Sequence, residues 1–140
     1  MFSITSRLKF NRIFKPVNET HCRYRVVLGS AGSGKSVNVA QDFILKLSDT
    51  KYTGANLLVI RKSEGTNRYS TFAELQAVIF RMCGEYWEDF WIINSSRLMI
   101  TSKITGNSII FRGVNDKKQR EKLKSITFPK GKLVWVWIEE

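Results

Sequence analysis

The stretch YRVVLGSAGSGKS, residues 24–36, is the most informative part of this sequence. Its second part, Gly29–Ser36, matches G-x-x-x-x-G-K-[ST], the pattern of a loop whose backbone N–H groups surround phosphate oxygens. Before the loop stands a short apolar, β-rich run, Tyr24–Leu28. After it, apolar residues recur at helical spacing: Val37, Ala40, Phe43, Ile44 and Leu47. We therefore expect a strand, a loop and a helix in succession, with the helix N-terminus and its dipole facing an anion.

The loop pattern assigns a role to each of its residues. Lys35 is expected to be the catalytic cation that neutralises the β- and γ-phosphates, and the Ser36 hydroxyl is expected to be a Mg²⁺ ligand. A glycine-rich turn before an ordinary helix is the alternative, but the order of the three segments favours a nucleoside triphosphate as the ligand. Eight residues are expected to contact its phosphates: Gly29, Ser30, Ala31, Gly32, Ser33, Gly34, Lys35 and Ser36.

The composition excludes several classes of protein. The chain has 140 residues, of which 43% are hydrophobic and 25% charged, as in a folded domain rather than a disordered segment. No apolar run approaches the roughly 20 residues of a membrane span, so we expect no membrane partner. Two isolated cysteines, Cys22 and Cys83, predict neither a zinc site nor a disulfide framework.

The net charge of +11 is concentrated in two segments. Residues 1–25 carry six basic and one acidic side chain, residues 117–132 carry seven basic and one acidic, and the rest is balanced. Such concentrated charge favours a polyanionic partner, of which double-stranded DNA is the obvious one. A solvated basic surface is the alternative.

The rest of the chain alternates between strand-like and helix-like segments. Ala55–Lys62 is an apolar run predicted to be a strand buried on both faces. Ser63–Ser70 is rich in turn residues. Thr71 and Glu74 match a capping box that opens a helix, which we expect to end at Gly84.

A β-hairpin and a last strand are predicted further along the chain. Leu98–Thr105 and Ser108–Arg112 flank a Gly106-Asn107 turn, and Lys132–Glu140 is a β-rich apolar run. The order of elements predicts an α/β domain, with a parallel sheet flanked by helices.

Two carboxylates, Glu139 and Glu140, end the last apolar run. A loop that grips a triphosphate needs an acidic Mg²⁺ partner and a group that activates water, and both belong at the carboxyl end of a neighbouring parallel strand. We therefore expect Glu139 to be a metal ligand and Glu140 to be the catalytic residue that orients or deprotonates water. Trp135 and Trp137 are interpreted as sheet packing.

Four blocks in consistent order resemble a known family: YRVVLGSAGSGKS, LLVIRKSEGTNRYSTFAEL, TGNSIIFRGVNDKKQREKLKSI and VWIEE. Together, over most of residues 9–140, they resemble the large terminase subunit of tailed bacteriophages. The resemblance implies a P-loop NTPase fold of the additional-strand type with a β-hairpin insertion. It also implies ATP and Mg²⁺ as cofactors, and ATP hydrolysis that drives viral DNA into the procapsid. The implied partners are DNA, a homo-oligomeric ring at the portal and a small terminase subunit, in the bacterial cytoplasm and transiently at the procapsid.

The chain departs from the pattern of this family at the loop. Many members carry an arginine where this chain has Ala31, so a transition-state cation is expected from elsewhere. Candidates are Arg61, Arg68, Arg112 and Arg120.

A second departure concerns the acidic strand. Many members have Asp where this chain has Glu139, which carries the same charge on one more methylene. The fold implied by the resemblance needs strands beyond Glu140, so we expect a chain truncated after the acidic strand and not competent as an enzyme alone. Residues 1–23 are then a basic lead-in, and residues 24–140 a partial P-loop ATPase domain that lacks the C-terminal nuclease domain.

The sequence thus predicts the ATP-hydrolysing part of a phage DNA-packaging motor. Two alternatives remain open at this point. One is another P-loop DNA motor, such as a helicase or repair ATPase, and the other is an inactive prophage remnant that binds nucleotide or DNA without turnover.

Overall fold

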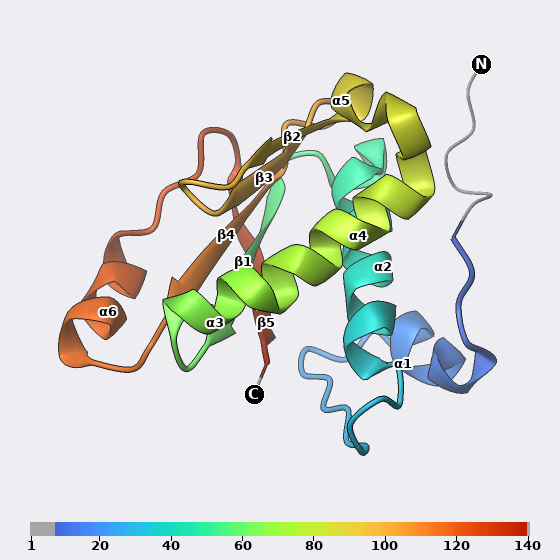
Figure 1. Cartoon of the computed structure of the whole chain (residues 1–140), viewed down its shortest axis with the longest axis horizontal. Coiled ribbons are helices and arrows are strands. Elements are labelled where there is room, and N and C mark those ends of the chain that lie inside the picture. Colours follow the sequence, from blue (N-terminus) through green and yellow to red (C-terminus); the bar gives the residue numbers. More distant parts are fainter. Residues whose placement is uncertain (1–7, 140) are drawn as a thin grey trace.

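A mixed five-stranded sheet runs through the computed structural model, which describes residues 8–139 (Figure 1). The strand order is β2-β3-β4-β1-β5. β1 pairs in parallel with β4 on one side and with β5 on the other, whereas β2, β3 and β4 pair antiparallel. The strands are β1 (Ala55–Arg61), β2 (Trp91–Asn94), β3 (Met99–Ser102), β4 (Ser108–Gly113) and β5 (Lys132–Ile138). The expected α/β sheet is therefore present, but it is not wholly parallel, because the predicted hairpin adds antiparallel strands to one side.

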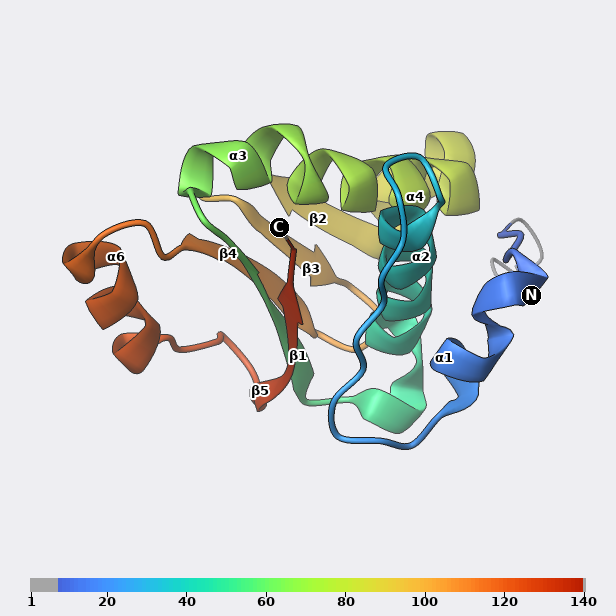
Figure 2. The same ribbon diagram turned by 90° about the horizontal axis from the view of Figure 1, so that it is seen from below.

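Helices cover one face of this sheet. The two longest, α2 and α4, pack against each other and lie over the sheet, while α6 lies beside the end of β4 on the other side of the molecule (Figures 1 and 2). The α-helices are α1 (Lys15–Glu19), α2 (Lys35–Ser48), α3 (Glu64–Tyr69), α4 (Thr71–Cys83), α5 (Trp87–Phe90) and α6 (Lys117–Lys122). None of the helices in the described part of the chain is both long and apolar enough to cross a membrane.

The hydrophobic core lies between these two helices and the sheet. The helical spacing of α2 and α4 directs one apolar stripe of each inward, and alternate residues of β1 and β4 face that stripe. Fully buried members include Ile44, Leu47, Leu57, Val59, Leu75, Ile79, Ile109 and Phe111. Burying each such side chain contributes about 1.5–3 kcal/mol, so the core fixes α2 relative to β1.

A buried asparagine joins the three parallel strands at their starting ends. Asn56, the second residue of β1, has no exposed surface. Its Oδ1 accepts a hydrogen bond from the backbone N–H of Ser108 at 2.7 Å, on the β4 side. Its Nδ2 donates to the backbone carbonyls of Lys130 at 2.8 Å and Lys132 at 3.0 Å, on the β5 side. The amide therefore sets the register of both neighbours of β1.

The strand predicted at Tyr24–Leu28 does not form. The segment is an irregular connection that runs beside α2 (Figure 2), and the exposed fractions of Tyr24, Val26 and Leu28 are 77%, 82% and 89%. A strand is stabilised by a neighbour that pairs with its N–H and C=O groups, and no strand of the described chain pairs with this segment. The prediction was wrong because β propensity does not supply a pairing partner.

Two local predictions around α3 were also wrong. The turn-rich stretch contains helix α3, whose N-cap Ser63 accepts a hydrogen bond through its Oγ from the Thr66 N–H. The capping box is absent, because α4 begins at Thr71 itself and the Thr71 hydroxyl donates to Asn67 Oδ1 at 2.6 Å.

The other predicted elements agree with the structure. The helix after the loop, the central strand, the helix predicted to open at Thr71, the hairpin and the last strand correspond to α2, β1, α4, β3–β4 and β5. The predicted helix end at Gly84 is confirmed, with φ of 59° at that residue.

Replacing Asn56 by leucine should destabilise the fold. The Ser108 N–H would be left buried without its acceptor, at a cost of about 1–3 kcal/mol, in addition to the removal of the two donated hydrogen bonds. Urea denaturation followed by circular dichroism measures the change in free energy of unfolding. The matched control is Asn115→Leu, at an exposed asparagine. Equal stability of the Asn56 and Asn115 variants would contradict the role of the buried amide.

Candidate functional site

The glycine-rich loop adopts backbone angles that require glycine at two positions. Gly32 and Gly34 have φ of 77° and 86°, in the left-handed region that other residues avoid. A side chain at Gly29 would place its Cβ 3.0 Å from the Ser33 hydroxyl oxygen. A larger residue would therefore strain the backbone at Gly32 and Gly34, and at Gly29 it would displace the Ser33 side chain.

The Lys35 side chain folds back into this loop. Its Nζ donates to the backbone carbonyls of Gly29 at 2.6 Å and Ser30 at 2.9 Å, and to the Ser33 hydroxyl at 3.1 Å. The ammonium group thus lies at the centre of the turn, and its acceptors among residues 8–139 are all neutral oxygen atoms. A charged phosphate oxygen is a stronger acceptor than any of these three.

The first turn of α2 presents backbone donors beside the ammonium group. Gly34 is the N-cap and has no side chain to accept from the turn. Within the described residues, the N–H groups of Lys35, Ser36 and Val37 have no hydrogen-bond acceptor. Unpaired N–H groups at the start of a 14-residue helix, together with the helix dipole, favour an anion at this place.

Ser36 joins the loop to the end of the last strand. Its hydroxyl donates to Glu139 Oε1 at 2.8 Å, although the two residues are 103 positions apart in the sequence. Glu139 is held in turn through its backbone N–H, which donates to the Ile60 carbonyl of β1 at 3.0 Å. A hydroxyl and a carboxylate oxygen therefore meet next to the ammonium-bearing loop.

Trp137 contacts the second oxygen of the same carboxylate. Its indole Nε1 donates to Glu139 Oε2 at 3.0 Å, and its ring stacks on Phe43 of α2 with 6.3 Å between centroids. The interpretation of Trp135 and Trp137 as sheet packing is confirmed by their contacts with Phe43. The hydrogen bond was not predicted, although the signal was present: residues two apart on a strand share a face.

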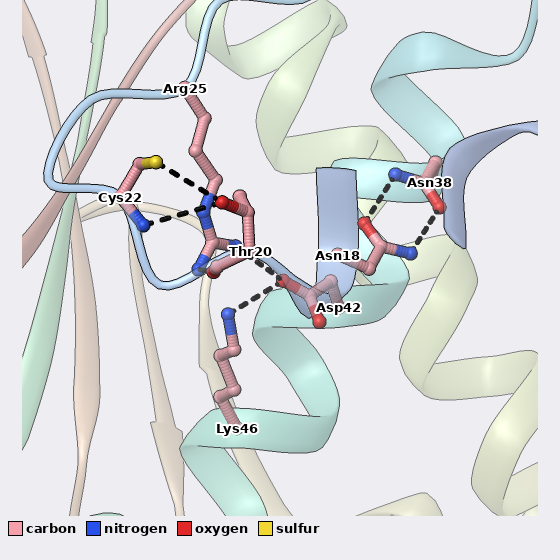
Figure 3. Close-up of polar contacts among 7 residues, drawn as sticks. All are labelled: Asn18, Thr20, Cys22, Arg25, Asn38, Asp42 and Lys46. Atoms are coloured by element: carbon pink, nitrogen blue, oxygen red, sulfur yellow. Dashed lines mark hydrogen bonds and ion pairs between the residues drawn. The ribbon is translucent and has the colours of Figure 1, made fainter. Parts of the chain in front are cut away.

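Residues 18–25, which precede the loop, contact α2 through polar side chains (Figure 3). Asn18 and Asn38 exchange two amide hydrogen bonds, at 2.8 and 2.9 Å, and Asn38 is 3% exposed. Further along α2, Asp42 lies 3.9 Å from the Arg25 guanidinium and 2.8 Å from the Lys46 ammonium. These contacts hold both ends of the segment that precedes the loop.

The structure brings most of the expected site residues together. Glu139 contacts the loop through Ser36, which follows Lys35 directly. Glu140 lies outside the described residues. Among the arginine candidates, Arg68 donates to the Ser95 carbonyl and Arg112 to the Phe111 carbonyl, neither of which belongs to the loop.

The donor atoms of the site fit Mg²⁺ better than a transition metal. Within the described residues, no group of three or more His, Cys, Asp or Glu side chains could hold a metal ion. Mg²⁺ is usually bound through one or two protein oxygens, with waters and phosphate oxygens completing its shell. Ser36 Oγ and Glu139 Oε1 are a pair of this kind.

Comparison with known proteins identifies related chains. The family described as phage terminase large subunit matches residues 21–140. The chain is 36% identical over 121 residues to the terminase large subunit of Bacillus phage SPP1, covering 86% of this chain and 26% of that protein. It is 31% identical over 122 residues to the PBSX phage terminase large subunit of Bacillus subtilis (strain 168), covering 84% of this chain and 24% of that protein. The chain thus spans about a quarter of the length of these relatives.

Proposed function

This chain belongs to the phage terminase large-subunit family, whose role is DNA packaging, and from that premise we propose that it is the ATP-hydrolysing part of the packaging motor. The observation that carries the proposal is the hydrogen bond between Ser36 and Glu139 at 2.8 Å. It places the two expected Mg²⁺ ligands in contact beside a loop that presents one ammonium group and unpaired N–H groups. These features support a P-loop NTPase domain, and the resemblance to the family adds the proposal that it is of the additional-strand type.

Each group of the site would act on a different part of the nucleotide. The N–H groups of the loop and of the first α2 turn bind phosphate oxygens, and Lys35 exchanges its three neutral acceptors for the β- and γ-phosphates. Ser36 and Glu139 would hold Mg²⁺, which supplies positive charge at the phosphates. Glu140 follows directly along the chain and would accept the proton of the attacking water.

The basic stretch at residues 117–132 supports double-stranded DNA as the partner. All seven of its basic side chains are exposed, and none forms an ion pair with another described residue. Thr127 of this stretch lines an open cleft of about 590 Å³, together with two basic residues, Arg97 and Arg112, and one acidic residue, Glu64. Exposed, unpaired positive charge beside a groove favours contacts with phosphates of the DNA backbone. The motor would assemble as a homo-oligomeric ring, with the portal and a small terminase subunit, in the cytoplasm of the bacterial host and at the procapsid.

Lys35→Ala should remove nucleotide binding. Each charge-assisted hydrogen bond to phosphate contributes about 1.5–3 kcal/mol, so the affinity should fall at least tenfold for each such bond that the variant cannot form. Isothermal titration with a slowly hydrolysed ATP analogue and Mg²⁺ measures the change. Lys62→Ala, at an exposed lysine, is the matched control. Unchanged affinity of the Lys35 variant would overturn the phosphate-loop proposal.

Glu140→Gln should separate binding from hydrolysis. Glutamine keeps the shape of the side chain but cannot accept the proton of water, so turnover should fall by about 10²–10⁴-fold while the analogue binds as before. Steady-state release of phosphate, measured in the assembly that turns over ATP, tests this. Glu121→Gln, at an exposed acid of α6, serves as control. An unaltered protein that binds ATP without any turnover would instead favour the inactive remnant.

Neutralising α6 should weaken DNA binding in a salt-dependent way. The triple variant Lys117→Gln, Lys118→Gln and Lys122→Gln should lower the slope of log K against log salt by up to about 0.9 for each phosphate that the helix no longer neutralises. Fluorescence anisotropy with a labelled duplex at several salt concentrations gives this slope.

A variant with the same net charge is the control for the α6 experiment. It carries Gln at Lys51, Lys62 and Lys103, which are exposed and lie outside both basic segments. An equal decrease of DNA affinity in the two triple variants would contradict a DNA surface at α6.

A further inference from the structure

The carboxylate of Glu139 is held from two directions. Ser36, in the first turn of α2, donates to Oε1 at 2.8 Å, and the indole of Trp137 donates to Oε2 at 3.0 Å. One oxygen therefore faces the hydroxyl beside the loop, and the other is engaged by the strand that carries the acid.

The indole is itself fixed by its surroundings. Trp137 is 6% exposed, pairs with Val59 in the parallel β1–β5 ladder and stacks on Phe43 at an interplanar angle of 29°. Because the ring cannot turn without leaving this packing, the direction of its N–H bond is set by the sheet and by α2.

Trp135 lies on the same face of β5, two residues before Trp137. It also packs on Phe43, with 6.0 Å between ring centroids, and on Tyr52 at 5.4 Å. Its indole N–H has no hydrogen-bond acceptor within the described chain. The two tryptophans thus share their packing, and differ in the contact with Glu139.

We propose that Trp137 is a positioning residue, whose indole N–H holds Glu139 so that Oε1 faces Ser36. This inference rests on the proposed function, in which Glu139 Oε1 and the Ser36 hydroxyl oxygen are Mg²⁺ ligands. Glutamate has one more rotatable bond than aspartate, so its carboxylate samples more positions unless another group restrains it. Hydrogen-bond partners of metal-binding carboxylates orient them, and removing such a partner typically costs 10–100-fold in metal affinity.

The test compares Trp137→Phe with Trp135→Phe. Phenylalanine keeps an aromatic ring in the layer against Phe43 but removes the N–H donor. For Trp137→Phe, we expect the Mg²⁺ concentration that gives half-maximal binding of a slowly hydrolysed ATP analogue to rise about tenfold. Its affinity for the analogue without Mg²⁺ should not change, and Trp135→Phe should leave both quantities as they are. Equal Mg²⁺ requirements in the two variants would overturn the inference.

A spectroscopic measurement tests the contact without nucleotide. The indole N–H signals of the four tryptophans are recorded by ¹H–¹⁵N NMR and assigned with the two Phe variants. In Glu139→Ala, the Trp137 signal should move and the Trp135 signal should not. A stationary Trp137 signal overturns the inference, whether or not nucleotide binds and even if Trp137→Phe does not fold. If the signal moves but the unaltered chain binds no ATP analogue, the proposed function fails, and the role of Trp137 towards Mg²⁺ fails with it.

Discussion

The pairing of β5 with β1 is the interaction on which the candidate site depends. At the start of β5, the Lys132 N–H donates to the Gly54 carbonyl at 3.0 Å, and Asn56 holds the carbonyls of Lys130 and Lys132. At the other end, the Glu139 N–H donates to Ile60. β5 lies at the edge of the sheet, so β1 is its single strand neighbour among the described residues. Several apolar side chains of β5 are exposed. The position of Glu139 therefore depends on its pairing with β1, which the buried core holds in place.

The glycine-rich loop is positioned beside Glu139 by helix α2 rather than by a strand. No strand of the described chain leads into it, and its anchor is α2, which packs on the sheet through Ala40, Ile44 and Leu47. The segment before the loop adds the Asn18–Asn38 amide pair and the ion pair of Arg25 with Asp42. The half of the site that carries positive charge thus belongs to a helix, and the half that carries negative charge belongs to the sheet. The contact of Ser36 with Glu139 closes the gap between them.

Periodic apolar patterns in the sequence predicted the helices and strands that bury an apolar face against one another. The helical spacing of α2 and the apolar run of β1 were sufficient, because each presents a face that the other buries. Tyr24–Leu28 is also rich in β-forming residues, but no strand of the described chain pairs with it. A local pattern cannot reveal whether such a partner exists. Helix α3 was missed because its anchor lies far away in the sequence: Asn67, within the helix, donates through its Nδ2 to the Arg112 carbonyl of β4 at 2.9 Å. The loop residues of the site are readable from their spacing, but a contact between positions 36 and 139 depends on the whole fold.

Helix α2 also links the two hydrogen bonds of the Glu139 carboxylate. Ser36 lies in its first turn, and Phe43, about two turns later, supports the indole of Trp137. The hydroxyl that faces Oε1 and the ring beneath the donor to Oε2 therefore belong to one rigid element. A shift of α2 along or away from β5 changes both contacts together, whereas a rearrangement of the loop alone changes only the contact with Ser36. Because the loop ends where α2 begins, any ligand that moves the helix start also alters the restraint on the acid.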